Sequence, residues 1–195
     1  MLVRELMTQD PVTVTPATPV KVALALLAEH RITSLPVLGS HGRLRGVVSE
    51  ADLIRDRVHP DQRAHERPVD GAWDVPRLVA EVMTTHAVTV HPDDDLADAV
   101  ELLTSTVVKS VPVVEHDGQL VGMLSRSDIV KVLARADEDL AGEVHALLVS
   151  VGLHDWFAQV TDGTVSLTGP DDSPDRTMAH LVAGTVPGVV AVTDD

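Results

Sequence analysis

The sequence predicts an α+β fold made of two copies of one β-α-β-β-α unit, followed by a smaller α-β-β-α-β unit. Three observations support this prediction: an internal duplication spans residues 5–133, each copy alternates short strand patterns with amphipathic helix patterns, and the pattern changes after Arg135. A single copy is too small to bury both faces of its sheet. We therefore expect the two copies to pack together pseudo-symmetrically.

The duplication appears at an offset of 76 residues. Comparing 5–57 with 81–133 gives 18 identical pairs out of 53 without a gap. Met7-Thr8 becomes Met83-Thr84, for example, and Ser49 and Asp52 become Ser125 and Asp128. The sequence thus predicts repeat 1 at 1–57, a linker at 58–77 and repeat 2 at 78–135.

The expected strands and helices of repeat 1 lie at 13–14, 19–30, 35–38, 44–48 and 50–57. Thr18 followed by Pro19 is typical of a helix N-cap and first helical position, and predicts where the first helix begins. The same order of elements is expected at 89–133. There Asp94-Asp95 supply favourable negative charge at the start of a helix over 96–105.

Several motifs occur in the same order in both copies. In the first they are Leu6-Met7-Thr8, Val12-Thr13-Val14-x-Pro16, His30-Arg31-Ile32, Leu35-Pro36-Val37 and Gly46-Val47-Val48-Ser49-x-x-Asp52-Leu53. This ordered set resembles a CBS domain, and the two copies together resemble a CBS pair over about residues 1–135. The resemblance implies two repeats packed through their sheets, which often dimerise into a flat disk.

In CBS pairs that bind adenosyl ligands, a Gly-h-h-[Ser/Thr]-x-x-Asp stretch carries the main contacts, where h is apolar. It occurs here at 46–52 and 122–128. A helix N-terminus offers free N–H groups to a phosphate, and the Asp carboxylate can accept both ribose hydroxyls. We expect the apolar residues Val14, Leu35 and Val48, or Val90, Val111 and Leu124, to sandwich a purine. The other candidate ligand-binding residues are Ser34, Pro36, Ser49, Asp52, Arg55, Lys109, Ser110, Pro112, Ser125, Arg126 and Asp128.

Two simpler interpretations remain open. Ser-x-x-Asp is also a capping box, in which both side chains only satisfy N–H groups of their own helix. The cationic residues differ between the copies, and each alone is also consistent with a solvated surface charge. Repeat 1 has His30-Arg31, Arg55 and Arg57, whereas repeat 2 has Thr106-Val107 at the first position but carries Lys109, Arg126, Lys131 and Arg135.

Composition excludes several classes of function. The net charge of −15 disfavours nucleic-acid and anionic-membrane partners, and favours AMP, ADP or an S-adenosyl compound over ATP unless Mg²⁺ neutralises the polyphosphate. The chain has no Cys, no recognisable catalytic motif and no metal signature among its 10 His residues. We therefore expect no cofactor and no metal. The start lacks a signal peptide and no stretch suits a membrane span, so we also expect a cytoplasmic protein.

Residues 138–195 resemble a BON domain, through a hairpin around Asp162-Gly163 and the ending Val186-Pro187-Gly188-Val189. We expect a helical stripe at 140–151, a helix at 175–185 and a last strand at 186–192. BON domains elsewhere are associated with membranes. This segment has ten acidic residues against the single basic Arg176, so a protein contact is the better expectation.

The three aromatic side chains each admit two interpretations. Trp73 in the linker is either a packing anchor or a lid over a pocket. Trp156-Phe157 is either an exposed anchor for a partner or the aromatic core of the small C-terminal unit, and we favour the core.

The sequence as a whole predicts a non-catalytic sensor that binds an adenine nucleotide and acts on a partner in trans. The alternative is a structural dimerisation scaffold with no bound nucleotide, and an enzyme with an unrecognised site is the third interpretation. The helices at 19–30 and 96–105 carry more aliphatic surface than one small sheet covers, so we also expect a homodimer built through the CBS helices.

Overall fold

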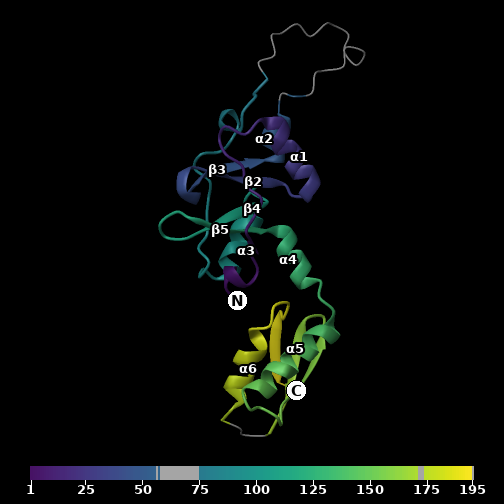
Figure 1. The fold of residues 1–195 in the computed structure, drawn as a ribbon. Coiled ribbons are helices and arrows are strands. Elements are labelled where there is room, and N and C mark those ends of the chain that lie inside the picture. Colours follow the sequence, from purple (N-terminus) through teal and green to yellow (C-terminus); the bar gives the residue numbers. More distant parts are fainter. Residues whose placement is uncertain (56, 58–74, 171–173, 195) are drawn as a thin grey trace, which may run out of the picture.

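The structure of the chain is a computed structural model that describes residues 1–55, 57, 75–170 and 174–194. Figure 1 shows the two repeats side by side and a third, separate unit beyond helix α4. The elements of repeat 1 are η1 (Val3–Glu5), β1 (Thr8–Gln9), α1 (Val20–His30), β2 (Ser34–Leu38), η2 (Ser40–Gly42), β3 (Leu44–Ser49) and α2 (Glu50–Ile54). Those of repeat 2 are η4 (Val79–Glu81), α3 (Leu96–Ser105), β4 (Ser110–Val114), β5 (Leu120–Ser125) and α4 (Arg126–Leu133).

The duplication seen in the sequence is reproduced in the backbone. Strands β2 and β3 form an antiparallel hairpin in which Ser34 faces Ser49, and β4 and β5 form its counterpart, in which Ser110 faces Ser125. Each hairpin has one register shift, and the two shifts occupy equivalent positions 76 residues apart. The mixed α+β pair of repeats is therefore confirmed.

Each repeat completes the core of the other. Strand β1 pairs with β5 of repeat 2, and Val3 lies fully buried in the core of repeat 2. In return, Val79 lies in the core of repeat 1, and Thr84 exchanges two backbone hydrogen bonds with Val47. The sequence repeats at 1–57 and 78–135 are thus not separate packing units, because burying these short apolar segments requires both copies.

Three local predictions in repeat 1 need correction. Pro19 is the N-cap of α1, while the Thr18 hydroxyl oxygen accepts a hydrogen bond from Thr15 N–H and so stabilises the preceding turn. The predicted strand at 13–14 is a single parallel bridge between Val14 and Val37. Helix α2 ends at Ile54 rather than at 57, because Arg55 leaves the helical region of backbone conformation.

The third unit contains α5 (Asp137–Ser150), β6 (Phe157–Thr161), β7 (Thr164–Thr168), α6 (Arg176–Gly184) and β8 (Ala191–Asp194). The hairpin between β6 and β7 turns through Asp162 and Gly163, both with positive φ as a two-residue type I′ turn requires. Strand β8 adds parallel to β7, giving the sheet order β6-β7-β8. It begins later than the predicted 186, because Gly188 turns the chain with a φ of +106°.

The two neighbouring aromatic residues of this unit have different environments. Trp156 is buried in a core formed by α5, α6 and the sheet, whereas Phe157 is 62% exposed on β6. The core interpretation therefore holds for Trp156 and not for Phe157. The reason is the alternation of side chains along β6, which turns Phe157 to the sheet face that no described helix covers.

The predicted linker at 58–77 falls mostly on residues 58–74, which are outside the described part of the chain, and so does Trp73. Within the described residues, no helix is both long enough and apolar enough to cross a bilayer.

Candidate nucleotide-binding cleft

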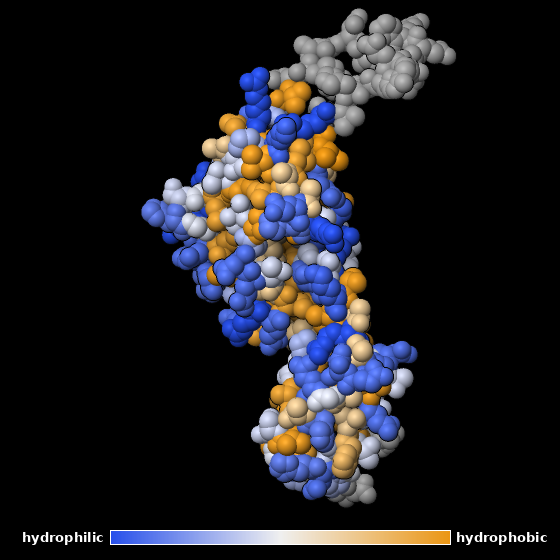
Figure 2. All heavy atoms as spheres, turned by 45° about the vertical axis from the view of Figure 1, so that its right-hand side comes forward, coloured by the Kyte–Doolittle hydropathy of each residue, from blue (hydrophilic) through white to orange (hydrophobic). Residues whose placement is uncertain are grey.

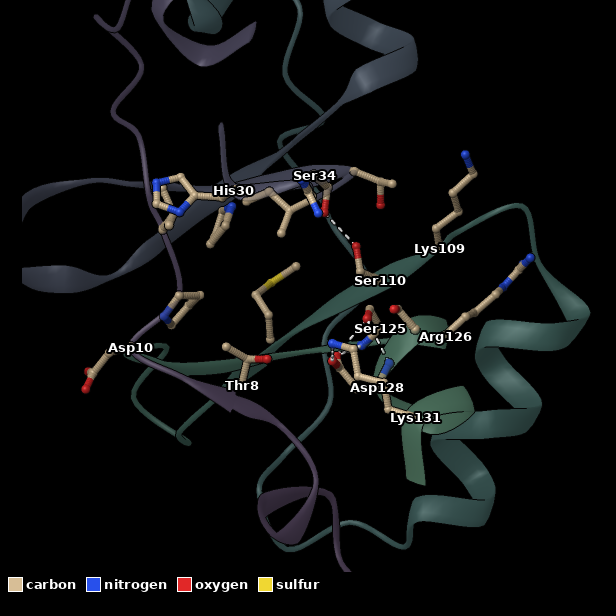
Figure 3. Close-up of a pocket in the computed structure, with 18 residues that line it drawn as sticks. Thr8, Asp10, His30, Ser34, Lys109, Ser110, Ser125, Arg126, Asp128 and Lys131 are labelled. Carbon is tan, nitrogen blue, oxygen red and sulfur yellow. Dashed lines mark hydrogen bonds and ion pairs between the residues drawn. The ribbon is translucent and has the colours of Figure 1, made fainter. Parts of the chain in front are cut away.

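A cleft of about 520 Å³ opens between the two repeats, a volume suited to a small ligand. Its wall comes from four segments: the residues after β1, the connection from α1 into β2, the start of β4, and the junction of β5 with α4 (Figure 3). The lining residues are Thr8, Asp10, Pro11, Val12, His30, Arg31, Ile32, Thr33, Ser34, Pro36, Lys109, Ser110, Met123, Ser125, Arg126, Ser127, Asp128 and Lys131.

The Ser-x-x-Asp motif forms a complete capping box at the edge of this cleft. Asp128 Oδ2 accepts hydrogen bonds from the Ser125 N–H at 3.0 Å and from the Ser125 hydroxyl at 2.7 Å, while Ser125 Oγ accepts from the Asp128 N–H at 3.3 Å. The capping interpretation is therefore confirmed. Both contacts use Oδ2, and the other oxygen, Oδ1, lies 3.4 Å from the exposed Lys131 ammonium. Capping thus leaves one carboxylate oxygen for a further acceptor role.

Ser34 and Ser110 meet at the centre of the repeat pair. Their hydroxyl oxygens lie 2.6 Å apart, and both residues line the cleft. The two positions are equivalent in the duplication, since 110 − 34 = 76, so this hydrogen bond joins matching points of the two copies. Figure 3 shows the pair between the strands, above Ser125 and Asp128.

Two of the predicted cationic residues hold the cleft wall in place. The Arg126 side chain donates to the carbonyl oxygens of Leu103, Thr106 and Val108 at 2.8–3.1 Å, which ties the end of α3 to the start of α4. Lys109 forms an ion pair with Glu50 of repeat 1, with a nitrogen–oxygen distance of 2.5 Å. In Figure 3 both side chains extend outward from the rim, whereas Asp128 and Lys131 lie together at one wall.

Seven of the predicted site residues line the cleft: Ser34, Pro36, Lys109, Ser110, Ser125, Arg126 and Asp128. The six apolar residues expected to sandwich a purine do not, because they are buried in the two repeat cores: Val14, Leu35, Val48, Val90, Val111 and Leu124. Leu35, Val48, Val111 and Leu124 lie on strands β2 to β5, and Val14 and Val90 form single bridges to Val37 and Val113. All six pack with residues of α1 or α3 in the cores, so the apolar cleft surface comes from other positions. Pro11, Val12, Ile32 and Met123 form it instead.

The remaining candidates are Ser49, Asp52, Arg55 and Pro112. They are the duplication partners of Ser125, Asp128, Lys131 and Pro36. Shifting every cleft residue by 76 positions gives its partner in the other repeat, and we call this set of partners the mirror side. Ser49 and Asp52 form the same capping box as their counterparts.

Sequence reasoning missed Thr8, Asp10 and Thr33. Thr8 and Asp10 line the cleft because β1 pairs with β5 of the other repeat, whereas Thr33 directly precedes the predicted Ser34. The recurrence of Met-Thr at the head of each copy is a sequence signal that marks Thr8.

Among the described residues, no group of three or more His, Asp or Glu side chains is arranged to hold a metal ion. In the third unit, a hydrogen bond with His180 lowers the pKa of Asp194 below its usual value, and the nearby Arg176 guanidinium lowers it further.

The CBS-domain family model matches residues 3–59 and 79–135, which together make up more than half of the chain. The chain belongs to the CBS-domain family. It is 34% identical over 139 residues to the chloroplastic CBS domain-containing protein CBSX1 of Arabidopsis thaliana, a match that covers 63% of this chain and 59% of CBSX1. CBSX2 of the same plant is 34% identical over 135 residues, with 60% and 56% covered. The chain thus spans less than two thirds of the length of these relatives.

Solved structures share the fold of the repeat pair. The structure of CBSX2 in complex with AMP matches with a TM-score of 0.55 and 31% identity, covering 67% of this chain and 93% of that one. The CBS domain pair of protein MJ0100, solved with 5′-methylthioadenosine and S-adenosyl-L-methionine, has a TM-score of 0.57 and 22% identity, covering 69% of this chain. At that identity the second likeness shows the fold alone.

Proposed function

We propose that the chain is a non-catalytic regulatory sensor that binds an adenosine-containing ligand in the cleft between its repeats and acts on a partner in trans. One observation carries the proposal: Asp128, with one carboxylate oxygen left free of capping, lies in a cleft large enough for a nucleotide. The AMP complex of CBSX2, which is 31% identical to this chain, supports adenosine as the common part of the ligand.

In this proposal the cleft provides each part of the ligand with matching chemistry. Val12, Ile32 and Met123 supply apolar surface for the purine. Asp128 Oδ1 accepts the ribose hydroxyls, and the Ser125 oxygen remains engaged in the cap. Burial of the purine and charged hydrogen bonds to the ribose together give both affinity and orientation.

The third unit is proposed to be a BON-like domain that contacts protein rather than lipid. Its described residues 137–170 and 174–194 are predominantly acidic among the charged positions, which opposes approach to anionic headgroups. It joins α4 directly, and α4 carries Asp128 and Lys131 of the cleft. A ligand that shifts α4 would therefore shift this unit as well.

The second candidate function is a dimerisation scaffold without a nucleotide. Exposed apolar side chains on α2 and α4 favour it, namely Ile54 at 58% exposure, Val130 at 63% and Leu133 at 61%. The first two are partners in the duplication, so a homodimer would bury matching surfaces of both repeats. A sensor can also be a dimer, so dimerisation alone does not separate the two candidate functions. The scaffold differs from the sensor in binding no nucleotide in the cleft.

A thermal-shift screen of the full chain with AMP, ADP, ATP, S-adenosylmethionine and NAD tests the proposal. A ligand that binds only the native state stabilises it by mass action, by about 2.7 kcal/mol when the ligand concentration is one hundred times its Kd. This added stability raises the unfolding temperature. We expect at least one adenosine compound to raise it while a guanosine or pyrimidine nucleotide does not. No shift with any adenosine compound would favour the scaffold.

A further inference from the structure

The two sides of the repeat pair differ in charge. Arg31, Lys109, Arg126 and Lys131 line the cleft together with only two acidic residues, Asp10 and Asp128, so the formal charge of the lining is 4 − 2 = +2 with His neutral. Counting Glu50 as well, because it pairs with Lys109, leaves 4 − 3 = +1. The Arg126 guanidinium is bound to backbone carbonyl oxygens, so the attraction for an anion rests on Arg31 and Lys131. The whole chain carries −15. The cleft is therefore positive although the chain as a whole is strongly negative.

The mirror side lacks this excess of positive charge. A shift of 76 positions puts Val107 in the place of Arg31, Glu50 in the place of Arg126 and Arg55 in the place of Lys131. Its charged residues are Lys109 and Arg55 against Glu50 and Asp52, so the formal charge is 2 − 2 = 0. Lys109 is common to both sides, because it is also the counterpart of Thr33, and its ammonium is paired with Glu50 at 2.5 Å.

The difference matters for a ligand that carries a phosphate. Charges within about 8–10 Å of one another interact appreciably at physiological salt, and a cleft lined by one sign concentrates that potential. Lys131 stands 3.4 Å from Asp128 Oδ1, so a cation accompanies the proposed ribose acceptor. A 5′-phosphate is attracted there. S-adenosylmethionine carries a sulfonium and a net positive charge, and is not attracted.

We propose that the cleft selects a phosphate-bearing adenosine ligand of the AMP type over neutral or cationic adenosyl compounds, and that the mirror side binds no such anion. Each chain then takes one nucleotide. This inference rests on the proposed function and adds to it the charge class of the ligand and its stoichiometry.

Isothermal titration calorimetry of the full chain with AMP, adenosine and S-adenosylmethionine tests the inference. We expect one AMP per chain, and tighter binding of AMP than of the other two, with an advantage that shrinks as salt is raised. Lys131→Gln should weaken AMP by about fivefold, as for a single exposed ion pair, and leave adenosine unchanged. Lys21→Gln, which removes an exposed cation on α1 outside the cleft, is the matched control and should change neither affinity.

The outcomes separate the two proposals. If adenosine or S-adenosylmethionine binds as tightly as AMP, if two AMP bind per chain, or if Lys21→Gln and Lys131→Gln have equal effects, the inference is wrong while the adenosine sensor stands. If none of the three compounds binds, this inference is overturned. The sensor proposal is overturned with it only if ADP, ATP and NAD also fail in the thermal-shift screen.

Discussion

Arg135 donates a hydrogen bond of 2.6 Å to the carbonyl oxygen of Pro187, and so joins the end of α4 to the turn that precedes β8. The same guanidinium forms an ion pair with Glu143 of α5 at 2.5 Å. Gly188 lies against this joint, since a Cβ placed there would come within 2.9 Å of the Val132 carbonyl oxygen. Figure 2 shows the larger body of the repeats meeting the smaller unit at a narrow waist.

Removing the Arg135 side chain should uncouple the third unit from the cleft. In the wild-type chain we expect AMP to slow amide hydrogen exchange at 186–190, because α4 and this turn move as one. Arg135→Ala should abolish that effect. Arg176→Ala, which removes an exposed ion pair within the third unit, is the control and should preserve it. Persistence of the AMP effect in Arg135→Ala would mean that the signal does not pass through this joint.

Asp128 and Asp52 form identical capping boxes, so they provide a matched pair for separating capping from binding. Asp128→Asn should weaken AMP by about tenfold or more, because hydrogen bonds to a charged group contribute about 1.5–3 kcal/mol. Asp52→Asn should cause a similar change in unfolding temperature with little effect on AMP. Unchanged AMP affinity in both variants would leave only the capping role.

The exchange of segments between repeats requires glycine at one close approach. A Cβ on Gly46 would lie 2.2 Å from the backbone oxygen of Thr84, so Gly46→Ala should destabilise the chain by about 1–3 kcal/mol in urea unfolding. Gly142→Ala is the control, because no atom lies within 4 Å of its Cβ position in α5. It should be neutral or stabilise by up to about 1 kcal/mol. Equal effects would contradict the close approach.

The hydrogen bond with His180 lowers the pKa of Asp194, and this predicts a pH dependence for the third unit. A carboxyl group with a lowered folded-state pKa stabilises the fold above its unfolded value of 3.8, and that contribution is lost as pH falls through the folded-state pKa. Asp194→Asn should therefore reduce the acid-induced loss of β8 amide protection that sets in as pH falls below the unfolded value of 3.8. An identical acid profile in the variant would contradict this prediction.

The acidic third unit should not bind membranes. Co-sedimentation with vesicles of phosphatidylserine and phosphatidylcholine at low salt, where electrostatic attraction is strongest, should leave the full chain in the supernatant. A basic amphipathic protein serves as the positive control for sedimentation. Recovery of the chain with the vesicles would overturn the assignment of this unit to protein contacts.

The sequence was most informative where its signal is local and repeated. The offset of 76 predicted both hairpins and both capping boxes, because strand alternation and Ser-x-x-Asp depend on neighbouring residues. The sequence was less informative where packing between distant segments decides which side chains face the cleft. Val14 and Leu124 looked like purine contacts, but both face the cores, and the apolar lining comes from Val12 and Met123.

The exchange of N-terminal segments explains the rest of the missed site. Nothing near Thr8 in the sequence indicates that it lies beside Met123 of the other repeat. The start of α1 after Pro19 and the end of α2 at Ile54 also differ from the predicted helix boundaries. Local hydrogen bonds and backbone conformation compete with helix propensity at these ends.

The most direct test of the central claim is a titration of the ¹⁵N-labelled full chain with AMP, followed by amide chemical shifts. Binding in the cleft predicts saturable shifts at Ser34, Ser110 and residues 125–131, and smaller ones at the mirror positions 49–55. Absence of saturable shifts, or shifts confined to 49–55, would contradict an adenosine site in this cleft.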